Sequence, residues 1–283
     1  MPDRHAELLA MLRSLKLPAM VDELPELALK AAKAQLSHEA FLYELVQAEV
    51  SQRHERRIAR LLQRSGLPLE KTFRTLDQSR FPPLVRQQLE RLRAGGFVDE
   101  AINVVAVGPP GVGKSHALAA VAHELVLQGQ PVLWTSAGTL VQRLLAAKRD
   151  LRLPQALAQL DRYAFLVLDD IGYIQHDQDE MEVLFAVLSE RYEHKSVGIS
   201  TNLVFSDWVR IFKSPLTTMA AIDRVVHHAV ILDLQPVTSY RAQTAVTQQE
   251  RQRAPRRATS AVMAPTEPTT TGDERSPPLD PPR

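Results

Sequence analysis

The segment at residues 108–115 constrains the fold of this chain more than any other part of the sequence. It reads Gly-Pro-Pro-Gly-Val-Gly-Lys-Ser, follows an apolar run at 102–107, and precedes a stretch at 116–128 with the apolar spacing of a helix. A glycine-rich loop of this pattern between a strand and a helix is typical of phosphate-binding loops. A chance turn ending in Lys-Ser would not need those flanking elements. The segment therefore predicts a nucleotide-binding protein.

The residues of this loop suit a triphosphate, which is a compact polyanion that needs several converging backbone N–H groups. Gly111 and Gly113 permit the backbone angles and the close approach, because neither has a Cβ. The following helix adds free N–H groups and the positive end of its dipole. We expect Lys114 to reach the β- and γ-phosphates and the Ser115 hydroxyl to bind Mg²⁺. The expected nucleotide contacts are Gly108, Pro109, Pro110, Gly111, Val112, Gly113, Lys114, Ser115 and His116.

The composition is that of an ordinary soluble chain. Its 283 residues are 45% hydrophobic, carry a net charge of +1 and supply enough apolar mass for a core. No apolar run approaches the ~18 residues that span a membrane, and the first residues lack the basic-then-apolar layout of a signal peptide. The absence of cysteine excludes disulfides, thiolate zinc sites and thiol nucleophiles. These features predict a cytoplasmic protein with no membrane partner.

An N-terminal domain of three helices without strands is expected over residues 1–77. Apolar spacing predicts the helices at about 6–15, 21–35 and 37–66, with Ser37 as the N-cap of the third and Gly66 just past its end.

Strands and helices are expected to alternate in a second domain, residues 78–245. The predicted strands are the apolar runs at 102–107, 132–135, 165–169, 197–200 and 230–234. The predicted helices are 84–93, the stretch ending at 128, 139–148, 179–192, 207–212 and 220–228. Continuous apolar strands are typical of a parallel sheet with helices on both faces, so the fold class is doubly wound α/β with its ligand at the carboxyl ends of the strands. Phe97 either covers an adenine base or packs in the core.

Two acidic residues at the end of a buried strand supply the second half of the expected site. Asp169 should hold Mg²⁺ together with Ser115, and Asp170 should orient or deprotonate the attacking water. Asn202, after the next strand, could hydrogen-bond that water or the γ-phosphate. The alternatives are a cap for the acid pair and a turn role for Asn202.

Three residues near the last strand invite further hypotheses. Arg224 could reach the γ-phosphate of a neighbouring subunit and stabilise transition-state charge, or it could form a surface salt bridge. His227 and His228 should point in different directions on a helix, with no acid or cysteine cluster beside them. We therefore expect the two histidines to be structural.

A basic segment lies between residues 51 and 93, with eleven Lys or Arg against four acidic residues. Five of its arginines recur at spacings that place them on one face of the third helix, namely Arg53, Arg56, Arg57, Arg60 and Arg64. Acids are scarce nearby, so these guanidinium groups repel one another unless a polyanion lies against them. The backbone of double-stranded DNA fits, with little sequence preference, and a merely solvated face is the alternative.

The third expected segment, residues 246–283, is a tail rich in proline and threonine. From residue 255 onward it holds seven prolines in 29 residues with almost nothing apolar. Such a composition cannot bury enough surface to offset its ordering entropy, and we expect the segment to be disordered.

Taken together, these residues resemble the IstB-like ATP-binding proteins, AAA+ helper ATPases of insertion-sequence transposition that are related to the DnaC helicase loaders and to DnaA. The resemblance covers roughly residues 5–243. A phosphate loop alone would indicate only an NTPase. More specific are Gly172-Tyr173, the Arg-Tyr-Glu at 191–193, and Asp223-Arg224 with the two histidines that follow.

The resemblance implies an AAA+ P-loop fold behind a small helical domain, and a Mg²⁺-dependent ATPase that oligomerises on DNA. Its partner would be the transposase encoded by the same element. By this match Lys114, Asp170, Asn202 and Arg224 are the catalytic residues, with Asp169 at the metal. Many relatives have glutamate where Asp170 stands, and the shorter side chain reaches less far, so slow hydrolysis is an open alternative.

Two other functions remain open on the sequence. The same engine could load a replicative helicase, with the N-terminal helices binding protein rather than DNA. It could also serve as a nucleotide-gated adaptor with negligible turnover.

Overall fold

The computed structural model describes residues 4–173, 178–212 and 214–240. All of these residues belong to one compact unit. The expected tail at 246–283 therefore lies outside the described residues. Within the described part of the chain, no helix is both long and apolar enough to cross a membrane.

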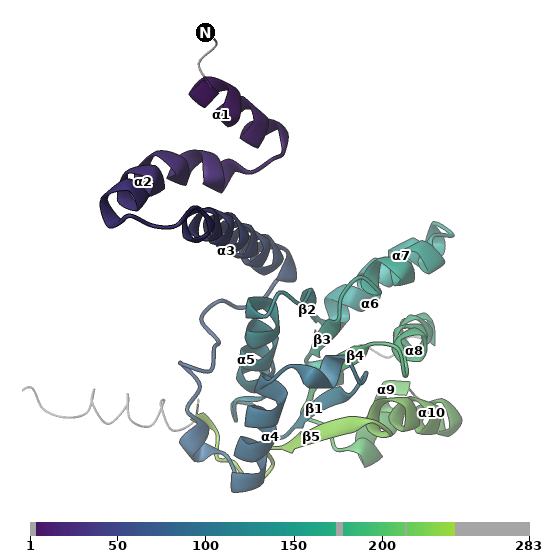
Figure 1. The fold of residues 1–283 in the computed structure, drawn as a ribbon. Coiled ribbons are helices and arrows are strands. Elements are labelled where there is room, and N and C mark those ends of the chain that lie inside the picture. The colour runs from purple at the N-terminus through teal and green to yellow at the C-terminus, as the bar shows by residue number, and fades with distance from the viewer. Residues whose placement is uncertain (1–3, 174–177, 213, 241–283) are drawn as a thin grey trace, which may run out of the picture. The chain divides into compact units, whose positions relative to one another are not determined.

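Five parallel strands form a sheet in the order β2-β3-β4-β1-β5 (Figure 1). Their bounds are β1 Asn103–Val107, β2 Val132–Ser136, β3 Phe165–Asp169, β4 Ser196–Thr201 and β5 Ala229–Asp233. The register pairs Val107 with both Thr201 and Asp233, so the carboxyl ends of β1, β4 and β5 are level at one edge. The expected parallel sheet flanked by helices is confirmed.

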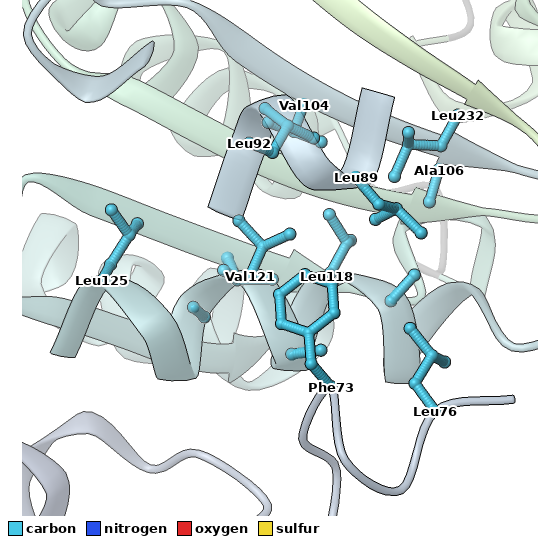
Figure 2. Packing of buried hydrophobic residues seen from close by; sticks show 14 of the residues in the cluster. Phe73, Leu76, Leu89, Leu92, Val104, Ala106, Leu118, Val121, Leu125 and Leu232 are labelled. Atoms are coloured by element: carbon cyan, nitrogen blue, oxygen red, sulfur yellow. The ribbon is translucent and has the colours of Figure 1, made fainter. Parts of the chain in front are cut away.

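Helices cover both faces of the sheet because successive strand residues point to opposite sides. On one face, α4 (Pro83–Arg93) and α5 (Lys114–Leu127) pack against Val104 and Ala106 of β1, as Figure 2 shows. The side chains of Val105 and Val107 pack in a second hydrophobic cluster on the other face. The helices of that cluster are α6 (Ala137–Arg149), α7 (Leu153–Leu160), α8 (Gln178–Arg191), α9 (Val209–Phe212) and α10 (Pro215–Val226).

Three helices precede this α/β region, α1 (Arg4–Ser14), α2 (Pro18–Ala34) and α3 (His38–Ser65). The Ser37 side chain accepts a hydrogen bond from the Ala40 N–H at the start of α3, which confirms it as the N-cap. Gly66 follows α3 with a φ of 68°, and a Cβ there would lie 2.8 Å from the Trp134 carbonyl oxygen of β2. A glycine is therefore needed where α3 ends against the sheet.

A buried carboxylate joins α3 to α2. Glu49, only 3% exposed, accepts hydrogen bonds from the backbone N–H groups of Ala19 (2.8 Å) and Met20 (3.3 Å) and from Nε of Arg53 (2.8 Å). It thereby caps the first turn of α2, whose own N-cap residue, Leu17, supplies no side-chain bond. Burial acts to raise the pKa of Glu49, but the Arg53 guanidinium and the two N–H donors outweigh it and the pKa is lowered.

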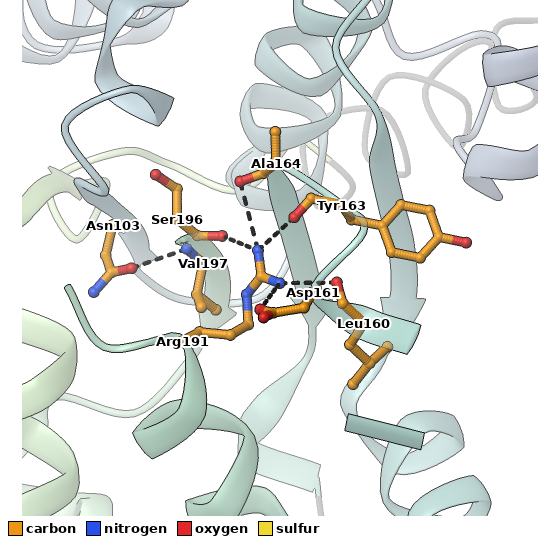
Figure 3. A network of polar contacts seen from close by, with 8 residues as sticks. All are labelled: Asn103, Leu160, Asp161, Tyr163, Ala164, Arg191, Ser196 and Val197. Carbon is orange, nitrogen blue, oxygen red and sulfur yellow. Dashed lines mark hydrogen bonds and ion pairs between the residues drawn. The ribbon is translucent and has the colours of Figure 1, made fainter. Parts of the chain in front are cut away.

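A buried arginine holds the amino-terminal edge of the sheet together (Figure 3). Arg191, at the end of α8, donates to the carbonyl oxygens of Leu160 (2.9 Å), Tyr163 (2.9 Å) and Ser196 (3.0 Å). Asp161 is the nearest acid, at 4.0 Å, and is about half exposed. Burial lowers the pKa of Arg191 to about 10, which still leaves the guanidinium charged at neutral pH. This network ties α7, β3 and β4 to α8.

The structure corrects two local expectations and decides between the two roles that were open for Phe97. Helix α7 has no counterpart in the sequence analysis, and α10 begins at Pro215 rather than near residue 220, because Ser214 caps a turn with proline in its first position. Phe97 is buried and packs edge-on against Phe165 at a ring separation of 5.3 Å. Phe165 begins β3, at the edge of the sheet opposite the phosphate loop, so Phe97 packs in the core and does not cover a base.

Candidate nucleotide-binding site

The phosphate loop lies between β1 and α5 at the carboxyl edge of the sheet. Gly113 has a φ of 102°, and a Cβ at this position would lie 3.2 Å from the Phe81 ring. A side chain there would therefore be both strained and crowded. At Gly108, a Cβ would lie only 2.8 Å from the backbone carbonyl carbon of Leu234. Two of the expected glycines are thus required by the geometry of the loop.

Lys114 is the first residue of α5 and is 6% exposed. Its Nζ donates a 2.9 Å hydrogen bond to the Pro109 carbonyl oxygen across the loop. The ammonium group is therefore held over the mouth of the loop, which is the position from which a phosphate-binding lysine acts.

Ser115 and Asp169 lie together, as expected from the sequence. The Ser115 hydroxyl donates to Oδ1 of Asp169 at 2.7 Å, although 54 residues separate them in the chain. Ser200, which the sequence analysis did not assign to the site, donates to the same carboxylate oxygen and accepts a 2.8 Å bond from the Asp170 N–H. A serine fully buried within an apolar strand was the signal that could have revealed it.

Asp170 adopts a φ of 57°, a left-handed conformation uncommon for a residue other than glycine. The turn brings it into the lining of the cavity above the loop, together with Asn202 from the end of β4. The Asn202 Oδ1 lies 2.3 Å from where a Cβ of Gly172 would be, so a larger residue at that position would displace the Asn202 side chain. Both expected polar residues therefore face the same space as the phosphate loop.

The cavity has a volume of about 630 Å³, and its lining includes residues outside the motifs identified in the sequence. Besides the loop it is lined by Lys71, Thr75, Leu76, Asp77, Arg80, Phe81 and Tyr240. The Tyr240 N–H donates to the Gly111 carbonyl oxygen at 2.9 Å, and the Arg80 guanidinium lies 5.2 Å from the Tyr240 ring centre. Residues from before α4 and after β5 thus complete the walls.

His116 connects the loop to the segment before α4. Its Nε2 lies 3.2 Å from the Thr72 carbonyl oxygen and 3.1 Å from the Thr75 hydroxyl. Burial lowers the pKa of His116, which the bond to Thr72 only partly offsets. Phe73 and Leu76 of the same segment are buried in the core with α4 and α5, so this wall of the cavity is anchored.

These residues fit a nucleotide with Mg²⁺. Gly113 has no Cβ to crowd the Phe81 ring in the lining of the cavity, and the cavity volume is within the range of small-molecule sites. A hydroxyl and carboxylates are oxygen donors, the ligands that Mg²⁺ prefers. Ser115 and Asp169 are the pair that would hold the ion, with Asp170 facing the cavity beside them.

Arg224 lies far from this cavity in its own chain. It is in the last turn of α10, donates to the Ala220 carbonyl oxygen of the same helix, and stacks over the Phe185 ring at 4.7 Å. Asn103, the first residue of β1, donates to the Arg224 carbonyl oxygen, so this turn is at the amino edge of the sheet. Any contact of Arg224 with a nucleotide would have to be with that of another subunit.

The arginines of α3 divide into two groups. Arg53 binds Glu49 and the Lys16 carbonyl oxygen, and Arg57 donates to the Gly129 carbonyl oxygen at 3.0 Å. The idea that acids are scarce beside the whole row is therefore wrong for Arg53, whose partner lies one turn earlier on the same helix. Within the described residues, no carboxylate forms an ion pair with the remaining three, Arg56, Arg60 and Arg64, all of which are exposed.

Comparison with known proteins identifies the family. The model of the IstB-like ATP binding protein family matches residues 10–248. The chain belongs to this family. It is 38% identical over 243 residues to an insertion sequence ATP-binding protein of Sinorhizobium fredii, covering 86% of this chain and 81% of that protein. It is 34% identical over 229 residues to the ATP-binding protein of insertion sequence IS21 from Pseudomonas aeruginosa, covering 81% and 86%.

The solved structure of a replication initiation protein shares the fold of this IstB-like chain. Domain III of the replication initiation protein DnaA from Thermotoga maritima matches with a TM-score of 0.51 at 14% identity, over 65% of this chain and 75% of that one. A DnaC helicase loader matches with a TM-score of 0.46 at 19% identity, over 54% and 92%. The AAA+ P-loop fold expected from the sequence is confirmed.

Proposed function

We propose that this chain is the ATP-dependent helper of a transposase, which binds and hydrolyses ATP with Mg²⁺ and assembles on double-stranded DNA with little sequence preference. The observation that carries the proposal is the 2.7 Å contact between Ser115 and Asp169 at the mouth of the phosphate loop. It supports a metal-bound triphosphate, because a hydroxyl and a carboxylate converge where the β- and γ-phosphates would lie. The names of the insertion-sequence relatives support the biological setting.

Hydrolysis would rest on four groups of this chain. Lys114 and the loop N–H groups bind the phosphate oxygens and orient them for in-line attack. Asp170, which lines the cavity, orients the attacking water and accepts its proton, while Asn202 hydrogen-bonds that water or the γ-phosphate. Bound Mg²⁺ would neutralise charge on the β- and γ-oxygens.

Assembly would complete the site. Because Arg224 is at the opposite edge of the sheet from the cavity, it can supply charge only to the γ-phosphate of a neighbouring copy. Hydrolysis would then depend on the homo-oligomer, as with arginine residues donated in trans by other NTPases. The exposed arginines Arg56, Arg60 and Arg64 of α3 are the candidates for contact with the DNA backbone.

The decisive experiment combines binding and activity. Titration calorimetry with ATP and Mg²⁺ should give one site per chain, and Lys114→Ala should weaken binding or abolish turnover. The wild-type protein should stimulate DNA strand transfer by the transposase encoded beside it, and Lys114→Ala protein should not. Absence of ATP binding would refute the site, whereas ATP binding without any effect on the transposase would refute the proposed role.

The same experiment separates the helicase-loader and adaptor alternatives. A loader would act on a replicative helicase and leave the transposase unaffected. An adaptor would bind ATP and stimulate the transposase equally well with Asp170→Asn, which removes the catalytic carboxylate. A transposase gene beside the reading frame would favour the role proposed here.

A further inference from the structure

We propose that Glu193, His227 and His228 form a binding site for one Zn²⁺ ion, separate from the nucleotide cavity. One ligand atom from each of the three side chains lies within 4.8 Å of the other two. From the sequence alone, the two histidines are expected to be structural, because they should diverge on a helix with no acid or cysteine cluster nearby. Helix α10 instead ends at Val226, so both histidines follow the helix, and Glu193 supplies the acid from 34 residues earlier.

The ligand chemistry favours zinc. Two imidazoles and a carboxylate are the donor set of many zinc sites with three protein ligands and an open fourth position. All three side chains are exposed, so water can fill that position. Ligand atoms around a tetrahedral Zn²⁺ lie about 3.4 Å apart. Side-chain rotations that move each ligand atom by roughly 1 Å would therefore bring these groups onto an ion. Mg²⁺, which prefers oxygen donors, should not compete.

The backbone that carries the three ligands is held by hydrogen bonds on both segments. The N–H groups of His194 and Lys195 both donate to the Arg191 carbonyl oxygen, and Glu193, which precedes His194, has a left-handed φ of 59°. On the other segment, the Asn103 side chain donates to the Val225 carbonyl oxygen at 3.1 Å. The same side chain accepts a 2.9 Å bond from the Val197 N–H of β4, so one residue fixes both segments relative to each other.

The imidazole rings are also oriented for binding. Tyr192 lies with its hydroxyl 3.2 Å from Nδ1 of His227, which leaves Nε2 available to a metal. Zinc-binding histidines usually have their second nitrogen engaged in this way. The His227 and His228 rings lie 4.2 Å apart between centres at an interplanar angle of 66°. The two rings therefore contact each other, with one ligand atom of each within 4.8 Å of a Glu193 carboxylate oxygen.

An ion at this position would cross-link the turn after α8 to the end of α10. Because β5 begins at Ala229, directly after His228, the site is at the amino edge of the sheet, away from the phosphate loop. Zinc loading should therefore raise the melting temperature without requiring nucleotide. It would also restrain the helix turn that carries Arg224.

The test is a titration of tag-free, chelator-treated full-length protein with ZnCl₂ alone, followed by calorimetry. We expect one saturable site per chain, a zinc-dependent rise in melting temperature, and no displacement by Mg²⁺. His228→Ala, His227→Ala and Glu193→Gln should each weaken binding by more than about tenfold. His194→Ala, an exposed histidine beside Glu193, is the matched control and should bind as the wild type does.

Two further readouts keep the proposal testable if a variant folds poorly. ATP binding by each variant reports an intact fold, because the nucleotide cavity is at the opposite edge of the sheet. Co²⁺ in place of Zn²⁺ should give the visible absorption of a tetrahedral site with imidazole ligands in the wild type, and His228→Ala should abolish it. No saturable zinc binding, or binding that all three variants retain, would overturn the proposal.

Discussion

The Ser200 hydroxyl accepts a 2.8 Å hydrogen bond from the Asp170 N–H and so fixes the turn that aims the Asp170 side chain at the cavity. The same hydroxyl donates to Asp169. One buried serine therefore positions both acids of the site. Its removal should disturb catalysis more than nucleotide binding, because the phosphate loop does not depend on it.

We accordingly expect Ser200→Ala to lower the rate of ATP hydrolysis by about tenfold while the Kd for ATP changes little, since groups that orient metal ligands typically contribute 10- to 100-fold. Single-turnover hydrolysis and calorimetry measure the two quantities. Ser189→Ala is the control, because the Ser189 hydroxyl is buried in α8 and has no hydrogen-bond partner among the described residues. Equal rates for the two variants would contradict the role of Ser200.

A second prediction concerns the charge of Asp170. Asn tolerates left-handed backbone angles well, so Asp170→Asn should keep the φ of 57° and the fold. It removes only the proton acceptor, and we expect hydrolysis to fall by more than about 100-fold with ATP binding retained. Asp170→Glu tests the reach of the shorter side chain, and a faster variant would mean that the native aspartate limits turnover. Normal hydrolysis by Asp170→Asn would exclude Asp170 as the base.

The sheet could be predicted from the sequence because its three central strands are buried on both faces. Each apolar run, such as 165–169, coincides with a strand to within a residue or so at either end. Helix α7 was missed because its eight residues contain Pro154 and follow a loop with no capping residue. Short helices of this kind are stabilised by packing, which local sequence does not reveal.

The site residues that belong to a sequence motif could be predicted. The residues that reach the site only through tertiary contacts could not. Ser115 and Asp169 are found together because parallel strands end at one edge. The wall formed by Thr75 and Arg80 comes from a segment with no motif of its own. The pairing of Arg53 with Glu49 was visible in the four-residue spacing, but not the burial that makes Glu49 accept three hydrogen bonds.

The division of the arginines on α3 makes a prediction about DNA. The combined change of Arg56, Arg60 and Arg64 to Ala should weaken duplex binding and make the slope of log K against log salt shallower by about 2–3, since each phosphate contact contributes about 0.9. Fluorescence anisotropy at several salt concentrations measures this. Arg162→Ala, an exposed arginine outside α3, is the control. An unchanged slope in the triple variant would exclude these residues from the DNA interface.

The Glu49 carboxylate should make the N-terminal helices sensitive to acid. Because its pKa is lower in the folded protein than the ordinary 4.5, its contribution to stability is present above that pH and is lost as the pH falls through the lowered value. Glu49→Gln should cost about 1–2 kcal/mol at neutral pH and flatten this dependence. Glu44→Gln, which breaks only an exposed pair with Lys30, should change little. Hydrogen exchange in α2 as a function of pH measures both.

The Arg191 network gives the last prediction, on the stability of the α/β region. Lysine carries the same charge, but its three donors radiate from one nitrogen and cannot reach the carbonyl oxygens of Leu160, Tyr163 and Ser196 together. Arg191→Lys should therefore lower the free energy of unfolding by about 3 kcal/mol, because buried acceptors lose their donors. Urea denaturation measures it against Arg143→Lys, an exposed arginine on α6 that bonds only Gln159 among the described residues. Similar midpoints for the two variants would mean that water replaces the lost bonds and that the amino edge does not depend on Arg191.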